Sequence, residues 1–163
     1  MNTHVIAKRL ALSFALIVLA ASGAAAQGQD EPLITNEAAK GAVYWVEGGM
    51  GLNANAGVII GRTGVILVNA KINPASANMV IAEVAKLTPK PITTIILTHT
   101  DGQNGLTAYR DPLTIIAHEN GRKELAETGG RGALPPNRVP NSVVTMNQEL
   151  RTIDGVKVEF RYF

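Results

Sequence analysis

The feature that most constrains this chain is an apolar run that passes directly into a short polar loop. The run Ile92–Leu97 lacks strict alternation of apolar and polar residues, which favours a strand buried on both faces. His99, Asp101 and Gly102 follow it at once. In open α/β sheets such a loop lies at the carboxyl edge of the strand, where ligands bind. The pattern therefore predicts a sheet whose edge carries an imidazole and a carboxylate.

The remaining pattern alternates short strands with helices. Asn73 is suited to cap a helix that begins at Pro74, and Pro89 ends it. A second helix is predicted over 119–128, followed by a loop over 129–141. Strands are predicted at 43–46, 57–61, 65–68, 92–97, 113–117, 143–146 and 156–163. Early strands in a hairpin and later strands alternating with helices indicate an α/β fold with a mixed sheet.

The first 26 residues have the pattern of a secretory signal peptide. Lys8 and Arg9 precede an apolar run over 10–21, and the small residues 24–26 form a cleavage pattern near Ala26. The run is shorter than the roughly 20 residues that a spanning helix needs. We expect a secreted or periplasmic protein with no membrane span after cleavage, a polar lead-in over 27–41 and one domain over 42–163.

Composition excludes several classes of function. Without Lys8 and Arg9, the mature chain has equal numbers of basic and acidic residues, and it shows no basic arm or aromatic–basic face. Nucleic-acid binding is therefore not expected. Cysteine is absent, which rules out disulfides and thiolate metal sites.

His99 and Asp101 are the candidate metal ligands, and Asp101 is also a candidate catalytic residue. Residues two apart in an extended segment point the same way, so both side chains are expected to reach one ion. A catalytic zinc usually has three protein ligands and an open water position. The next polar residues, Gln103 and Asn104, offer only neutral amide oxygens, which suit zinc poorly.

Two other candidates have simpler explanations. His118 follows the predicted strand at 113–117 and is expected to hydrogen-bond locally at the start of the next helix. The segment Gly49-x-Gly51-x-x-Ala54 superficially matches a dinucleotide-binding fingerprint. That fingerprint requires a helix directly after the glycines, and here a strand is predicted over 57–61. A turn between strands is therefore the better interpretation.

Several segments, taken in order, resemble the metallo-β-lactamase superfamily over roughly 42–163. They are 43–51, 55–61, 64–70, 90–99 and 115–120, and the segment around His99 is similar to the superfamily's Thr-His-x-His-x-Asp-His metal loop. The resemblance implies part of an αββα sandwich, roughly its first half. It also implies zinc-dependent hydrolysis of a small-molecule ester, thioester, lactam or phosphoester by a metal-bound hydroxide.

The chain departs from that pattern at the metal loop. His99 keeps the first His, and Asp101 stands at the second His or at the Asp of a variant loop. Either Gln103 and Asn104 stand at the usual Asp and last His, or the Asp-His pair of the variant loop is deleted around Gln103. Asn69 stands where an Asp is common. The resemblance places the family's later ligands beyond the equivalent of Phe163.

Three functions therefore stay open: a secreted hydrolase with an impaired site, a non-catalytic binding or assembly module, and a truncated product without function. Exposed sheet edges are expected to favour self-association in each case.

Overall fold

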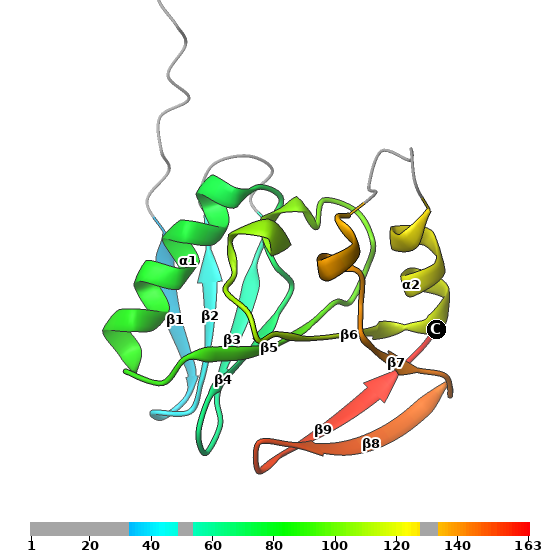
Figure 1. Ribbon diagram of the computed structural model, residues 1–163. Helices are drawn as coiled ribbons and strands as arrows, with labels where there is room; N and C mark the ends of the chain where they lie inside the picture. The colour runs from blue at the N-terminus through cyan, green and yellow to red at the C-terminus, as the bar shows by residue number, and fades with distance from the viewer. Residues whose placement is uncertain (1–32, 49–53, 128–133) are drawn as a thin grey trace, which may run out of the picture.

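A seven-stranded mixed sheet forms the centre of the part of the chain that the computed structural model describes, residues 33–48, 54–127 and 134–163 (Figure 1). Its strands lie side by side in chain order. They are β1 (Ile34–Ala39), β2 (Val43–Glu47), β3 (Ala56–Ile60), β4 (Val65–Val68), β5 (Ile92–Ile96), β6 (Thr114–His118) and β7 (Ser142–Val144).

The sheet changes from antiparallel to parallel at β4. Strands β1 to β4 pair antiparallel, whereas β4, β5, β6 and β7 pair parallel. The parallel part follows from the crossovers, because α1 (Pro74–Leu87) joins β4 to β5 and α2 (Glu119–Ala126) lies between β6 and β7. The predicted hairpin and the mixed α/β sheet are confirmed.

Helix α1 begins and ends where the sequence indicates. The Asn73 side chain accepts a hydrogen bond from the Ser76 backbone N–H at 2.8 Å, and Pro74 occupies the first turn, where no N–H is needed. Ala77, Val80 and Val84 are buried against the sheet.

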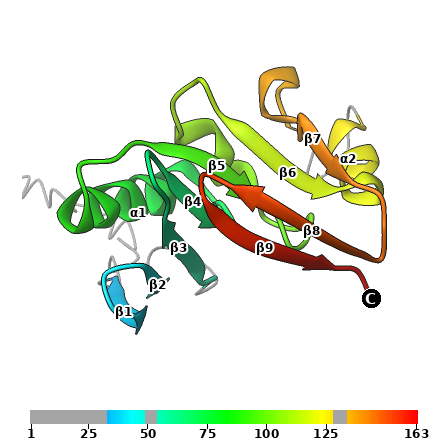
Figure 2. The same ribbon diagram turned by 90° about the horizontal axis from the view of Figure 1, so that it is seen from below.

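Two apolar cores lie on opposite faces of the sheet. Figure 1 shows the helices and the short 3-10 turns η1 (Asn104–Ala108) and η2 (Pro136–Arg138) on one face. Figure 2 shows the hairpin β8 (Gln148–Ile153) and β9 (Val156–Arg161) across the other. Under the hairpin, Ile66, Ile96 and Ile116 pack with Val158 and Phe160. Burying such a side chain stabilises the fold by about 1.5–3 kcal/mol.

Two strands and the two 3-10 turns were not predicted from the sequence. β1 falls within the expected polar lead-in, and its residues pair with β2 although half of them are polar. β8 is hidden because Glu149 and Arg151, which form an ion pair, occupy its half-buried positions. The η1 turn directly follows the polar loop.

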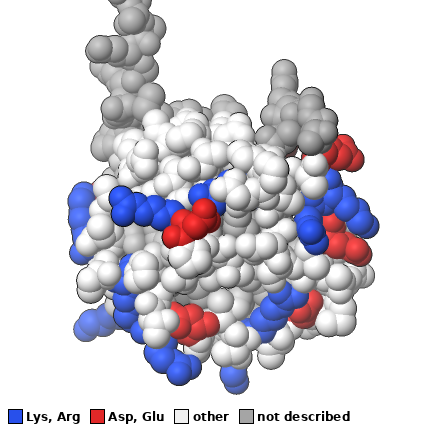
Figure 3. All heavy atoms as spheres, viewed as in Figure 1, with Lys and Arg blue, Asp and Glu red and all other residues white. Residues whose placement is uncertain are grey.

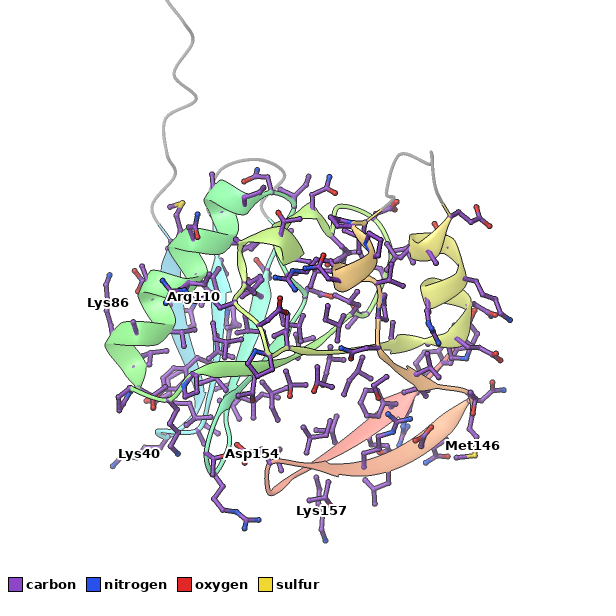
Figure 4. All side chains as sticks on the ribbon, in the orientation of Figure 1. Lys40, Lys86, Arg110, Met146, Asp154 and Lys157 are labelled. Carbon is purple, nitrogen blue, oxygen red and sulfur yellow. The ribbon has the colours of Figure 1, made fainter. Side chains whose placement is uncertain are left out.

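Asp154 fastens the β8–β9 hairpin to the turn between β3 and β4 (Figure 4). Its carboxylate accepts hydrogen bonds from Thr63 N, Thr63 Oγ1 and Gly64 N, each at 2.8 Å. A Cβ at Gly61 would lie 2.3 Å from Asp154 Oδ2, so only glycine leaves room for the carboxylate there. The bonds from the Thr63 backbone, then from Gly64, hold the Asp154 pKa below its ordinary value.

Within the described ranges, none of the helices is long and apolar enough to cross a membrane. The signal peptide expected at 1–26 lies outside the described residues. Acidic and basic side chains are interspersed on the face that Figure 3 shows.

Candidate functional site

The candidate site lies where three neighbouring parallel strands end. Asn69 directly follows β4, His99 lies three residues after the end of β5 at Ile96, and His118 ends β6. The carboxyl ends of parallel strands share one edge of the sheet, where open α/β folds bind ligands. The chain therefore brings together the polar residues that the sequence analysis singled out.

Two cavities meet at His99 and Asp101, and both residues line each cavity. The first, called here the β4–β5 cavity, measures about 190 Å³ and is also lined by Ala54, Asn69, Lys71 and Gln103. The second, the β6 groove, measures about 230 Å³ and is also lined by His118, Glu124 and Tyr162. Both predicted site residues thus face shared space.

A turn, rather than an extended segment, brings Asp101 to the cavities. β5 ends at Ile96, and Gly102 adopts a positive φ of 64° within the turn that contains Asp101. Glycine populates this conformation without steric cost. The expected alternation of side chains along an extended loop was therefore wrong, although both residues line the same two cavities.

Gln103 is buried and builds the loop instead of serving as a ligand. Its Oε1 accepts from the Ala70 backbone N–H at 3.3 Å, and its Nε2 donates to the carbonyls of His99 and Asp101 at 3.3 and 3.0 Å. Both ends of the amide are engaged with the backbone. Asn104 is exposed.

Hydrogen bonds from neighbouring residues set the tautomer of His99. Asn69 Oδ1 accepts from both Thr98 N and Thr98 Oγ1 at 3.0 Å, and the same hydroxyl lies 2.9 Å from His99 Nδ1. A hydroxyl has one proton, which the bond to Asn69 uses. His99 Nδ1 must therefore carry its own proton and donate to Thr98, which leaves Nε2 with the lone pair.

Lys71 is a buried lysine on the wall of the β4–β5 cavity. Only 3% of its surface is exposed, and its Nζ donates to the Gly48 carbonyl at 2.8 Å and to the Ala54 carbonyl. Burial lowers the Lys71 pKa. Its backbone has a positive φ of 69°, as does that of Asn69 at 67°. The turn between them rests on Gly105, whose N–H donates to the Lys71 carbonyl at 3.1 Å.

His118 has the local role that its sequence context predicts. Its Nδ1 accepts from the Asn120 backbone N–H at 3.3 Å and caps α2. Its ring stacks on Tyr162 with centroids 3.8 Å apart, and Asn120 Nδ2 donates to Tyr162 Oη at 3.3 Å. The β6 groove therefore has an aromatic wall.

The donor set does not fit the zinc that the resemblance implies. Within residues 33–48, 54–127 and 134–163, no three His, Cys, Asp or Glu side chains gather at a point that could hold a metal ion. His99 and Asp101 supply two donors, and the Gln103 amide is bound to the backbone. A catalytic zinc usually takes three protein ligands.

Solved structures with a similar fold come from the metallo-β-lactamase superfamily. A metallo-β-lactamase from Hirschia baltica matches with 19% identity and a TM-score of 0.61, over 77% of this chain and 59% of that one. A sec-alkylsulfatase from Pseudomonas sp. matches with 17% identity and a TM-score of 0.55, over 74% and 27%. A flavo di-iron protein from Thermotoga maritima matches with 21% identity and a TM-score of 0.61, over 80% and 36%.

The chain has a metallo-β-lactamase fold. No family model and no curated protein matches the sequence. The fold is partial, since the chain spans 59% of the Hirschia baltica lactamase and 27% of the sulfatase. The predicted resemblance and fold class are confirmed.

Three residues of the site were not predicted from the sequence: Lys71, Thr98 and Tyr162. Lys71 carried a usable signal, because a charged residue three positions after the predicted end of the strand at Val68 lies at the same sheet edge as His99. Thr98 and Tyr162 act through contacts that only the folded chain creates.

Proposed function

We propose that this protein is an exported hydrolase that cleaves a small ester, thioester, lactam or phosphoester at the His99 cavities. The metallo-β-lactamase fold supports the class, because proteins of this fold include lactamases and a sulfatase by their names. The observation that carries the proposal is the bond from His99 Nδ1 to Thr98, which leaves Nε2 free to accept a proton beside two cavities.

The proposed step uses His99 as a general base. Nε2 accepts a proton from a water molecule as the water oxygen attacks the scissile carbonyl carbon or phosphorus. The imidazolium then returns the proton to the leaving oxygen, sulfur or nitrogen, so that water is added across the cleaved bond. A positioned histidine typically contributes 10²–10⁴-fold to such a reaction. Asp101 lies on the same cavities and is the second candidate catalytic group.

The zinc expected from the resemblance enters no step of this proposal. Elemental analysis of the purified chain should find well below one zinc per molecule, because His99 and Asp101 are two donors where three are usual. One tightly held zinc per chain would show that this description of the donor set is wrong.

The hydrolase proposal is tested on the mature chain, starting at Gln27, with a panel of chromogenic esters, thioesters, lactams and phosphoesters. Turnover above buffer is expected, with a loss of at least about a hundredfold in His99→Gln. Asp101→Asn is compared with Glu127→Gln, an exposed carboxylate that lines neither cavity. Absence of turnover across the panel, or full activity in His99→Gln, would refute the proposal. Export is tested separately by fractionating cells that express the full chain.

A non-catalytic binding or assembly module is the second candidate. The observation in its favour is Gln103, which holds the loop together in place of a metal ligand. This function predicts no turnover on any panel substrate, together with binding that His99→Gln leaves unchanged.

A further inference from the structure

Lys71 presents a buried positive charge that has no negative partner in the part of the chain that the structure describes. Its side chain is almost wholly enclosed, yet no carboxylate in the described chain lies within 4.0 Å of Nζ. The segment 49–53, which joins its two carbonyl partners, contains no acidic residue. Lysine is almost never fully buried unless it is paired, because the charged form loses its hydration.

Within residues 33–48, 54–127 and 134–163, backbone carbonyls satisfy only part of the ammonium group. Lys71 Nζ donates to Gly48 O and Ala54 O, whereas an ammonium has three donors. Lys71 and its acceptor Ala54 both line the β4–β5 cavity. An anion in the cavity would supply both the third acceptor and the missing counter-charge.

A second donor lies on the same wall. The Asn69 carboxamide is fixed by its oxygen, which accepts two bonds from Thr98. In the described chain its Nδ2 donors have no partner, and Asn69 lines the β4–β5 cavity. Asp101 is the one acid of this lining; it is exposed and forms no ion pair with Lys71.

We propose that the β4–β5 cavity is an oxyanion subsite, in which Lys71 Nζ and Asn69 Nδ2 bind the carboxylate, sulfate or phosphate group of a small substrate. The assignment of a substrate group to this subsite rests on the hydrolase function proposed above. The binding of an anion to the subsite can be measured without any turnover. The strained backbone supports the assignment, since Lys71 and Asn69 both hold a positive φ on this wall. Such conformations are uncommon outside glycine and cluster at functional sites.

Calorimetric titration of the mature chain with inorganic sulfate, inorganic phosphate and acetate, at low ionic strength, tests the subsite. Saturable binding at one site is expected for at least one of these anions, with affinity reduced by at least about tenfold in Lys71→Met. Lys90→Met is the matched control: Lys90 Nζ also donates to a backbone carbonyl, that of Gly61 at 2.7 Å, but Lys90 precedes β5. Equal loss in both variants, or no loss in Lys71→Met, would overturn the proposal.

Asn69→Asp tests the same site without removing the lysine. The new carboxylate keeps the acceptor for Thr98, replaces the Nδ2 donors and places a negative charge on the wall that carries Lys71. We expect anion binding to be lost and the melting temperature to rise, whereas retained binding would contradict the subsite. If circular dichroism shows that Lys71→Met does not fold, Asn69→Asp alone tests whether the β4–β5 cavity binds anions.

The two proposals fail in different ways. Anion binding that depends on Lys71, without turnover of any ester, would refute the hydrolase function and leave the subsite standing. Turnover that depends on His99, with no anion bound and no preference for anionic over neutral esters, would refute the subsite alone.

Discussion

The orientation of one exposed imidazole depends on the side chains of two neighbours. Asn69 takes the proton of the Thr98 hydroxyl, so the hydroxyl oxygen is left to accept from His99 Nδ1. The backbone N–H of Thr98, which donates to the same Asn69 oxygen, fixes the direction of the amide. The lone pair on His99 Nε2 is therefore available because of Asn69, which lies at the end of the adjacent strand β4.

Thr98→Val should change the tautomer of His99 with little loss of stability. The variant keeps the shape of the side chain but removes the acceptor for Nδ1–H, so the proton is expected to redistribute toward Nε2. The lost hydrogen bond should cost about 1 kcal/mol at most, because the site is exposed. Long-range ¹H–¹⁵N NMR of the imidazole measures the tautomer. Thr107→Val, which removes an exposed hydroxyl bonded to the Asn104 carbonyl, is the control. An unchanged tautomer in Thr98→Val would contradict the hydrogen-bond assignment.

Gly105→Ala should disrupt the turn that carries Asn69 and Lys71. A Cβ at Gly105 would lie 2.1 Å from the Ala70 carbonyl oxygen and 2.5 Å from that of Lys71, and both are backbone atoms. We expect a loss of about 3 kcal/mol in the free energy of unfolding, at the upper end for overpacking. Gly41→Ala has a strained φ but no atom within 4 Å, and should lose only about 1–2 kcal/mol. Urea denaturation gives both values, and equal losses would show that the contact does not matter.

Sequence reasoning at this scale found the residues of the loop but not their partners. His99 and Asp101 follow a strong strand pattern, which places them at a sheet edge. Lys71 lies three residues beyond the end of β4, and only the parallel pairing of β4 and β5 brings it to the same cavity.

Among the elements, those with local signals were predicted and those held by long-range contacts were not. Helix α1 has its own cap at Asn73 and a run of apolar residues at helical spacing. Strand β8 has charged residues at inward positions, where Arg151 lies 5.6 Å from the ring centre of Phe160. Its pairing with β9 and its position over the sheet depend on neighbours that its own sequence does not reveal.

The hairpin formed by β8 and β9 should become less firmly attached in acid. Hydrogen bonds from Thr63 and Gly64 lower the Asp154 pKa below 3.8, so the ionised carboxylate favours the folded state. This contribution is complete well above pH 3.8 and is lost as the pH falls through the lowered pKa of the folded chain. Asp154→Asn should therefore flatten the dependence of the melting temperature on pH below 3.8.

Glu127→Gln is the control for this pH dependence, because Glu127 is an exposed carboxylate without such hydrogen bonds in the described chain. If Asp154→Asn and the native chain lose stability in parallel from pH 6 to about pH 3, Asp154 does not anchor the hairpin in the way its contacts indicate.

As a whole, the described chain is a sheet covered by helices on one face and by a hairpin on the other. Its fold is that of the metallo-β-lactamases, although it spans 59% of the Hirschia baltica enzyme. The order of strands and helices made the α/β class with a mixed sheet predictable, and the resemblance of several ordered segments implied the family fold. The chemistry was less predictable, because His99 and Asp101 lie at the edge of the sheet as expected, while Gln103 uses its amide to bind the backbone.

The central claim is that His99, held by Thr98, supplies the hydrolytic chemistry of this site. The most direct measurement is kcat/KM for the best panel ester as a function of pH, for the native chain and His99→Gln, after treatment with a chelator. We predict pH-dependent turnover in the native chain and a loss of kcat/KM of at least about a hundredfold in His99→Gln across the pH range. Equal rates for the two proteins, or native turnover that disappears with the chelator, would contradict the account.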